Sequence, residues 1–156
     1  MQLDTTNIDD KHIIFALIFQ LSNHLQTIGD SFFGEVSSKQ WFVLLTLSIM
    51  KGYSPTLNEL SETVGSSHQN VKQLVLKLEQ RGYVEVKKDE VDARRLRIKL
   101  TPKSLEFHNS YQEKSNEFMT KLFDGLKTAD LAATKKVMSA LRDVLERMGK
   151  DYVSEK

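Results

Sequence analysis

The sequence contains no cysteine and only two prolines among its 156 residues. Without cysteine, disulfide bonds, thiolate metal ligands, cysteine nucleophiles and thiol redox sensors are excluded. No run of 18 or more apolar residues occurs, so we expect no membrane-spanning helix. The first twelve residues are acidic and lack the basic-then-apolar order of a signal peptide, which favours a cytoplasmic protein. A hydrophobic content of 40% and a charged content of 28% are typical of a globular domain with a core.

Motifs of the common enzyme classes are also missing. The sequence has no Gly-rich phosphate loop, no nucleophile elbow and no paired acid–base motif. Its histidines, His12, His24, His68 and His108, lack the His-x-x-x-His or Glu-x-x-His spacing that places two metal ligands on one helical face. We therefore expect no enzymatic activity, no metal site and no cofactor.

Charge is distributed unevenly along the chain, although the net charge is only +1. Residues 67–103 carry ten basic and five acidic residues, whereas residues 1–66 carry three basic and seven acidic ones. A localised basic segment favours binding of a polyanion such as nucleic acid. Charges that merely solvate one face of the fold would give the same composition.

Two helices are predicted in the first third of the chain, at about 8–28 and 38–51. The second follows a capping box formed by Ser37 and Gln40 and is expected to stop at Gly52. The apolar stripe of the first helix consists of Ile14, Leu17, Ile18, Leu21, Leu25 and Ile28.

Two shorter helices follow, separated by a turn at Gly65. Thr56 and Glu59 form a capping box for the first, and we expect Ser66 to cap the second together with Gln69. The buried stripe of the second helix is Val71, Leu74, Val75 and Leu78. Two helices joined by a glycine turn, the second polar at its start, indicate a helix-turn-helix.

The hydrophobic period then changes from 3.6 to 2. Apolar residues alternate with polar ones over residues 83–87 and again over residues 95–100, with about seven polar residues between them. This pattern predicts a β-hairpin of two half-buried strands. Thr101 and Pro102 then begin a helix to about residue 126, and Thr128 caps a last helix to about residue 149.

The polar start of the second helix of the pair is the first candidate site. A helix in the major groove presents its N-terminal turns to base edges, and its positive dipole end favours phosphate. Glutamine and asparagine can bond to adenine bidentately. The candidate residues are Ser66, Ser67, His68, Gln69, Asn70, Lys72 and Gln73. An ordinary solvated helix face is the alternative.

The hairpin is the second candidate site. Its candidate residues are Lys87, Lys88, Asp92, Arg94, Arg95 and Arg97. An arginine at a loop tip suits insertion into the narrow, negative minor groove. Asp92 stands two residues before Arg94, close enough to orient its guanidinium. A charged hairpin edge that prevents aggregation is the alternative; neither interpretation accounts for Asp89 and Glu90.

The sequence from Asp92 to Thr101, DARRLRIKLT, resembles the wing of MarR-family transcriptional regulators, in which Asp-x-Arg precedes a strand ending in Leu-Thr. The preceding residues, LEQRGYVEVKKDEV, resemble the family's junction of recognition helix and wing, and the motif match covers about 57–103. The resemblance implies a sequence-specific double-stranded DNA-binding regulator, a repressor whose operator affinity an effector lowers. It makes Arg94 the minor-groove arginine, Asp92 its orienting partner and the helix from Ser67 the recognition helix.

The resemblance also implies a homodimer, paired through the first helix and the last two, on a pseudo-palindromic operator. The fold class is then mainly α with a small antiparallel β-hairpin, a winged helix-turn-helix with N- and C-terminal dimerisation helices. Residues 1–36 would be the N-terminal dimerisation helix and loop, 37–103 the DNA-binding domain and 104–156 the C-terminal dimerisation helices. The apolar residues of the terminal helices allow pairing independently, because a small winged domain cannot cover them all. Packing within one chain is the alternative.

Members of the family bind small amphipathic or phenolic effectors. The candidate lining residues here are Phe15, Phe19, Trp41, Met50 and Phe107. Each could instead be a core residue, because aromatic residues at helical spacing usually pack. Some members sense zinc, so a metal-responsive regulator, with His108 as the residue to inspect, is an alternative. A dimeric winged-helix interaction protein without DNA binding is another.

Overall fold

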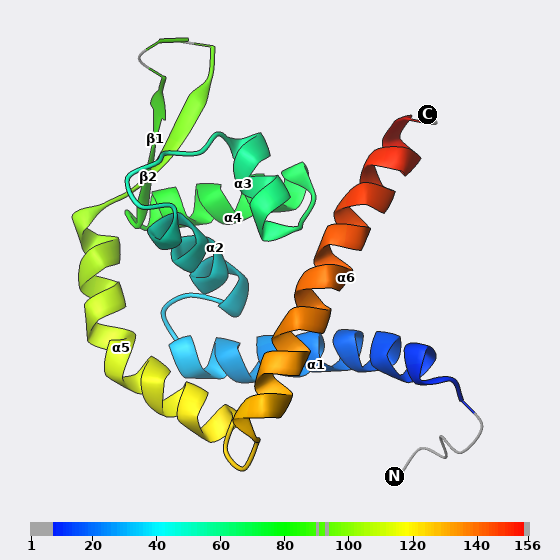
Figure 1. Ribbon diagram of the computed structural model, residues 1–156. Helices are drawn as coiled ribbons and strands as arrows, with labels where there is room; N and C mark the ends of the chain where they lie inside the picture. The colour runs from blue at the N-terminus through cyan, green and yellow to red at the C-terminus, as the bar shows by residue number, and fades with distance from the viewer. Residues whose placement is uncertain (1–7, 90, 93, 155–156) are drawn as a thin grey trace. The chain divides into compact units, whose positions relative to one another are not determined.

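A computed structural model describes residues 8–89, 91–92 and 94–154 (Figure 1). The elements are α1 (Asp10–Phe33), α2 (Ser38–Ile49), α3 (Leu57–Val64), α4 (His68–Gln80), β1 (Val84–Lys88), β2 (Leu96–Leu100), α5 (Pro102–Leu122) and α6 (Thr128–Ser154). The chain forms two compact units, one up to Asn109 and one from Ser110. The order of elements confirms the predicted winged helix-turn-helix, mainly α with one antiparallel hairpin. Within the described residues, no helix combines the length and the apolarity needed to cross a membrane.

A buried tyrosine bonds the segment between α1 and α2 to the start of the hairpin. Tyr83, at the start of the hairpin, is 1% exposed, and its hydroxyl donates a 2.7 Å hydrogen bond to Oε2 of Glu35. Its ring packs edge-on against Phe107, with centroids 5.4 Å apart. α2 begins with the predicted capping box of Ser37 and Gln40, but it ends two residues early, at Ile49.

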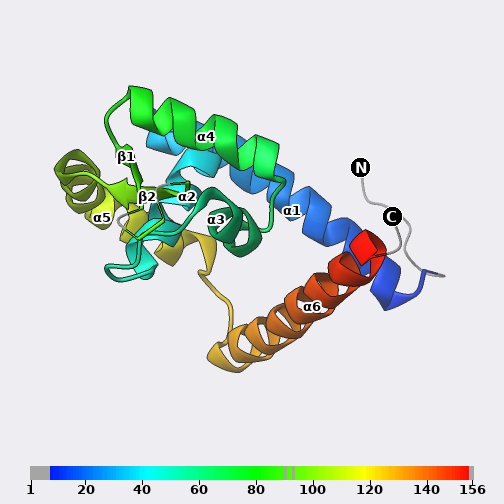
Figure 2. The same cartoon turned by 90° about the horizontal axis from the view of Figure 1, so that it is seen from above.

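α3 and α4 lie side by side in both views and pack against α2 (Figures 1 and 2). Leu60 of α3 and Val71 and Leu78 of α4 are fully buried, and Val75 is 4% exposed. The predicted apolar stripe of α4 is thus the one that packs, and this fixes which side of α4 faces outward. The predicted capping box of Thr56 and Glu59 is present at the start of α3.

The turn between α3 and α4 differs from the prediction. Gly65 adopts the left-handed conformation (φ 68°), and its N–H and that of Ser66 return to carbonyls in the last turn of α3. Ser66 therefore completes the end of α3. Ser67 caps α4 instead, its hydroxyl accepting the N–H of Asn70 at 3.3 Å. The prediction that Ser66 caps α4 together with Gln69 is wrong.

β1 and β2 pair antiparallel, with Val84 opposite Leu100 and Val86 opposite Ile98. The hairpin projects beyond α2, α3 and α4 (Figure 1), and only its base is buried. Ile98 is 2% exposed, whereas Leu96, on the same face but further from the base of the hairpin, is 51% exposed. The alternating pattern predicts the face of the strand but not how far the helices extend beneath it.

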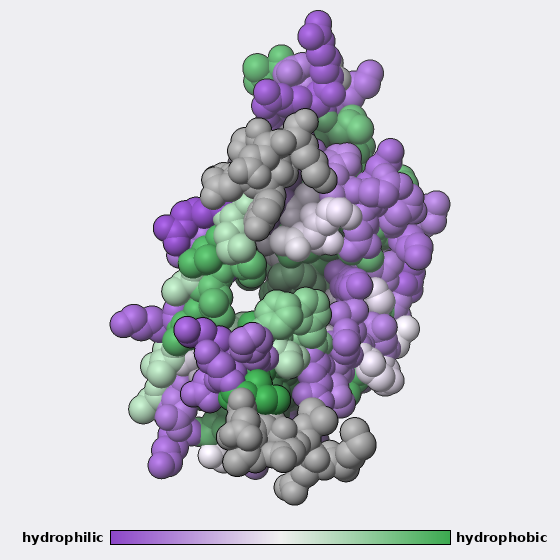
Figure 3. Space-filling model, turned by 90° about the vertical axis from the view of Figure 1, so that its right-hand side faces the viewer, coloured by the Kyte–Doolittle hydropathy of each residue, from purple (hydrophilic) through white to green (hydrophobic). Residues whose placement is uncertain are grey.

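The terminal helices expose much apolar surface. α1 runs five residues beyond its expected end, to Phe33, and α6 reaches Ser154; Thr128 is the first residue of α6 rather than its cap. Figure 3 shows apolar side chains open to view among polar ones. The exposed apolar residues of α1 are Ile14, Phe15, Leu17, Ile18, Phe19, Leu21, Leu25 and Ile28, and those of α6 are Val137, Met138, Val144, Leu145 and Met148.

Candidate nucleic-acid interface

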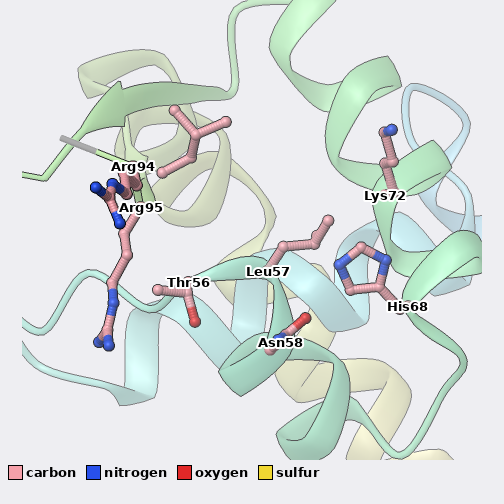
Figure 4. A pocket seen from close by; sticks show the side chains of 8 residues that line it. Thr56, Leu57, Asn58, His68, Lys72, Arg94 and Arg95 are labelled. Carbon is pink, nitrogen blue, oxygen red and sulfur yellow. The ribbon is translucent and has the colours of Figure 1, made fainter. Parts of the chain in front are cut away.

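A groove of about 600 Å³ separates α4 from the wing, which comprises residues 84–100. It is lined by Thr56, Leu57, Asn58, His68, Lys72, Arg94, Arg95 and Leu96. Figure 4 shows Arg94 and Arg95 on one side, His68 and Lys72 on the other, and the first residues of α3 between them. The groove therefore brings the two predicted sites, the start of α4 and the wing, to one surface.

The first two turns of α4 present a polar face to solvent. Because Val71 packs inward, Gln69, Lys72 and Gln73 are exposed, and no acidic residue lies in the first turn. The partial positive charge of the helix N-terminus and the Lys72 ammonium both favour an anion here. The hydroxyl of Ser67 is used as the cap, and Asn70 donates from Nδ2 to Ser66 Oγ at 2.8 Å.

Asp92 organises the wing tip in a different way from that predicted. Its carboxylate accepts the backbone N–H of Arg94 at 3.1 Å and pairs with Nε of Arg95 at 3.3 Å. The predicted pair with the Arg94 guanidinium is wrong, because an aspartate two residues earlier bonds more readily to the backbone in an Asx turn. In the described part of the chain, no carboxylate forms an ion pair with the exposed Arg94.

Asp89 has a structural role that sequence reasoning missed. Its carboxylate accepts the N–H groups of Val91 (2.8 Å) and Asp92 (2.9 Å) and pairs with Nε of Arg97. The Asp92 N–H, then Arg97 and Val91, lower the pKa of Asp89 to about 2. Asp89 therefore caps the wing turn as a carboxylate at neutral pH. Glu90 lies outside the described residues.

Arg97, one of the candidate residues of the wing, is held by contacts within the chain. Its side chain is only 20% exposed, and Nη1 contacts the Tyr53 hydroxyl (3.2 Å), the Ser54 carbonyl (3.1 Å) and Oε2 of Glu59 (3.2 Å). The guanidinium also lies over the Tyr53 ring, 5.6 Å from its centroid. The hydrogen bond to Asp89 and, to a smaller extent, the one to the Tyr53 hydroxyl raise the pKa of Arg97 above its ordinary value. The alternation along β2 predicts on which face of the strand Arg97 lies, but no sequence pattern predicts which residues pack against that face.

The remaining wing cations are exposed. Lys87 pairs with Glu85 at 2.8 Å, and because the side chains are 62% and 39% exposed this pair is worth little and can exchange for a phosphate. Lys88 is exposed at the end of β1, and Arg95 lines the groove. The wing can therefore offer several cations to a polyanion.

Within the described structure, the five residues predicted to line an effector pocket lie in different environments. Phe107 is buried in the core against Tyr83. Trp41 stacks on Phe33 at 4.7 Å. The two α1 phenylalanines, Phe15 and Phe19, pack edge-to-face but are more than half exposed, and Met50 is the C-cap of α2. An effector pocket built from these residues stays a prediction.

The histidines are scattered among the elements. His68 lines the groove, and His108 is exposed on α5. Of the residues that the structure describes, no three histidine, aspartate or glutamate side chains are grouped so that they could hold a metal ion.

A helix-turn-helix whose second helix and cationic wing share one groove defines the class of winged helix-turn-helix regulators. Residues 35–95 match the model of the MarR family. The chain is 27% identical over 118 residues, 76% of its length, to the transcriptional repressor MprA of Escherichia coli K12, and it covers 67% of that protein.

Solved structures of the same fold extend the match to nearly the whole chain. A MarR protein from Peptoclostridium difficile aligns with a TM-score of 0.79 and 23% identity, covering 100% of this chain and 98% of that one. Bordetella bronchiseptica BpsR, whose DNA binding is regulated by 6-hydroxynicotinic acid, aligns with a TM-score of 0.69 and 19% identity, covering 92% and 98%. Residues 35–95 are thus similar to the MarR family of transcriptional regulators, and the solved structures share the fold of nearly the whole chain.

Proposed function

We propose that the protein is a homodimeric repressor that binds double-stranded DNA at a pseudo-palindromic operator in the cytoplasm and is released by a small-molecule effector. The observation that carries the proposal is the groove between α4 and the wing. One side presents Lys72 and the polar start of α4, and the other presents Arg94 and Arg95. Polar and cationic groups on two separate projections suit a duplex, which offers two grooves flanked by phosphates.

α4 would lie in the major groove and the wing tip in the adjacent minor groove. Gln69 and Gln73 are exposed in the first two turns of α4, where a recognition helix meets base edges, and glutamine pairs best with adenine. Arg94 is exposed at the wing without an ion-pair partner among the described residues, so its guanidinium is available to a narrow minor groove. Lys72, Lys87, Lys88 and Arg95 would contact phosphates.

The apolar surface of α1 supports the homodimer. Phe15 is 64% exposed and Phe19 60%, on a helix whose whole apolar stripe is open to solvent. A soluble chain rarely leaves such a continuous stripe uncovered. A second copy would cover it in an isologous pairing, which places two α4 helices about one DNA turn (~34 Å) apart.

An effector is supported by one relative. BpsR is regulated in its DNA binding by a small aromatic acid. We extend this to the present chain as a compound of the same class, an aromatic carboxylate or phenol.

Selection of bound duplexes from a random library tests the function directly. The full chain is incubated with the library, and bound duplexes are sequenced after several rounds, with and without a panel of aromatic acids and phenols. Enrichment of a palindrome with half-sites about one turn apart is expected. Failure to enrich any sequence, or a monomer by light scattering at micromolar concentration, would overturn the homodimeric repressor.

A further inference from the structure

The two sides of the groove belong to segments far apart in the sequence, and few contacts join them. The wing meets the start of α3 through an isolated backbone bridge between Thr56 and Arg97, in which the Ile98 N–H donates to the Pro55 carbonyl at 2.9 Å. β2 otherwise pairs only with β1 among the described strands. The hairpin therefore depends on its base for its direction.

A cluster of four side chains strengthens this base. The Arg97 cluster consists of Arg97 on β2, Asp89 on the wing loop, Glu59 on α3 and Tyr53 before α3. Tyr53 donates its hydroxyl to Oε1 of Glu59 at 2.7 Å, so the acceptors of Arg97 are themselves connected. Glu59 is also fixed by the Thr56 N–H at 2.7 Å, as part of the α3 capping box. The guanidinium thus joins the wing loop to the first turn of α3.

The charges of the cluster argue against a phosphate contact. One guanidinium lies between two carboxylates, those of Asp89 and Glu59. A phosphate approaching Arg97 would meet two like charges and would have to displace bonds already formed. The exposed cations Lys72 and Arg94 face no such competition.

We propose that Arg97 is a positioning residue that holds the wing at a fixed angle to α3, so that Arg94 and α4 reach their two grooves together. The inference rests on the proposed DNA-binding function and assigns Arg97 no contact with DNA. Arginine suits this role because its planar fork reaches Asp89 with Nε and Glu59 with Nη1 at the same time. A lysine at this position has one charged nitrogen and cannot reproduce the fork.

Small rotations at the cluster have large effects at the wing tip. Arg94 lies three residues from Arg97, roughly 10 Å at 3.3 Å per residue. A rotation of about 10° at the base would therefore move the tip by roughly 1.7 Å, more than the ~0.5 Å range of good hydrogen-bond distances. The cluster decides whether Arg94 enters the minor groove while α4 stays seated.

The sharpest test replaces acidic residues of the wing, because a positioning role and simple electrostatics predict opposite changes in DNA affinity. Asp89→Asn removes a negative charge from a DNA-facing hairpin, so electrostatics alone predicts tighter binding. Loss of the cluster predicts weaker binding, by about fivefold or more for a broken charge-assisted pair. Glu85→Gln is the matched control, since Glu85 is an acid on the same hairpin outside the cluster. We expect Glu85→Gln to bind as tightly as wild type or more tightly.

The second test is a double-mutant cycle with the full chain and the selected operator in fluorescence anisotropy. Arg97→Lys should weaken binding in the wild-type background and change it by less than about twofold when Arg94→Ala is already present. A direct phosphate contact would lose the same affinity in both backgrounds, and Arg97→Lys would largely preserve it. Tighter binding by Asp89→Asn, or an undiminished Arg97→Lys effect beside Arg94→Ala, overturns the proposal.

Hydrogen exchange separates this inference from the proposed function. In Arg97→Lys the Ile98 amide, which bonds to Pro55, should exchange faster, while amides of α6 stay unchanged. Unchanged Ile98 exchange overturns the positioning role even if DNA binding is confirmed. If the wild-type chain binds no duplex, the proposed function is refuted, and so is the effect of Arg97 on DNA binding. Faster exchange of the Ile98 amide in Arg97→Lys would in that case still show that Arg97 fixes the wing against α3. Should Arg97→Lys fail to fold, Asp89→Asn, which keeps the size of the side chain and its amide oxygen as an acceptor, carries both measurements.

Discussion

Replacing Arg94 by alanine should weaken operator binding strongly and leave the fold intact. The side chain is exposed and forms no ion pair with a described residue, so its loss leaves no unpaired buried charge. The thermal midpoint should therefore stay close to that of wild type, because changes at such surface positions usually cost less than about 0.5 kcal/mol.

The expected loss of affinity follows from the number of wings. One good groove contact is worth about 1–3 kcal/mol. A dimer places two wings on one operator, so the loss doubles to about 2–6 kcal/mol, or about 30-fold to more than 10,000-fold in Kd. Fluorescence anisotropy with the selected duplex, in the same salt for both proteins, measures the change.

Arg95→Ala provides the comparison for Arg94→Ala. Arg95 lines the same groove but already pairs with Asp92, so part of its charge is satisfied within the wing. We expect a smaller loss than for Arg94→Ala, together with a weaker salt dependence, as for a phosphate contact. An Arg94→Ala variant that binds the operator as wild type does would refute the minor-groove assignment.

Three further outcomes follow from the structure. Gln69→Ala should change which duplexes are selected, whereas Lys72→Ala should weaken binding to all duplexes alike and lower the slope of log Kd against log salt by about 1 per contact. If both variants lose the same affinity for specific and for random DNA, Gln69 does not read bases. The hydrogen bond from the Asp92 N–H lowers the pKa of Asp89 to about 2, so the carboxylate stabilises the fold above its unfolded-state pKa and loses this effect as pH falls from about 4 to 2. The thermal midpoint of Asp89→Asn should therefore lie below that of wild type at pH 7, and the difference between the two midpoints should vanish on acidification. A difference that does not change with pH would show that the charge of Asp89 does not contribute to stability. Leu60→Ala, at a fully buried position of α3, should cost about 2–5 kcal/mol in urea unfolding; a cost under 1 kcal/mol would mean that the helix-turn-helix core is not packed as described.

The helices and the hairpin could be predicted because each depends on local chemistry. The capping boxes at Ser37 and Thr56 and the glycine at 65 form within a few residues, and the change of period from 3.6 to 2 marks the hairpin. The error at Ser66 arose because two adjacent serines compete for one cap, and only the end of α3 decides between them.

The candidate site was predicted in its parts but not in its internal contacts. The sequence indicates that Arg94 and Arg97 lie on the wing, and it cannot separate an exposed guanidinium from one held by distant residues. Arg97 meets Glu59 across 38 positions of the chain and Tyr53 across 44. Such pairings depend on how the wing docks against α3, which periodicity and capping do not encode.

The junction of α3 and α4 limits how this protein can change its DNA preference. Ser66 completes the end of α3 and Ser67 caps α4, so the two helices meet without a spare residue. One inserted residue would turn α4 by about 100° about its axis and bury the side chains that now face outward. Substitutions on the exposed face of α4 can therefore give this fold a new operator preference, whereas changes in the length of the turn cannot.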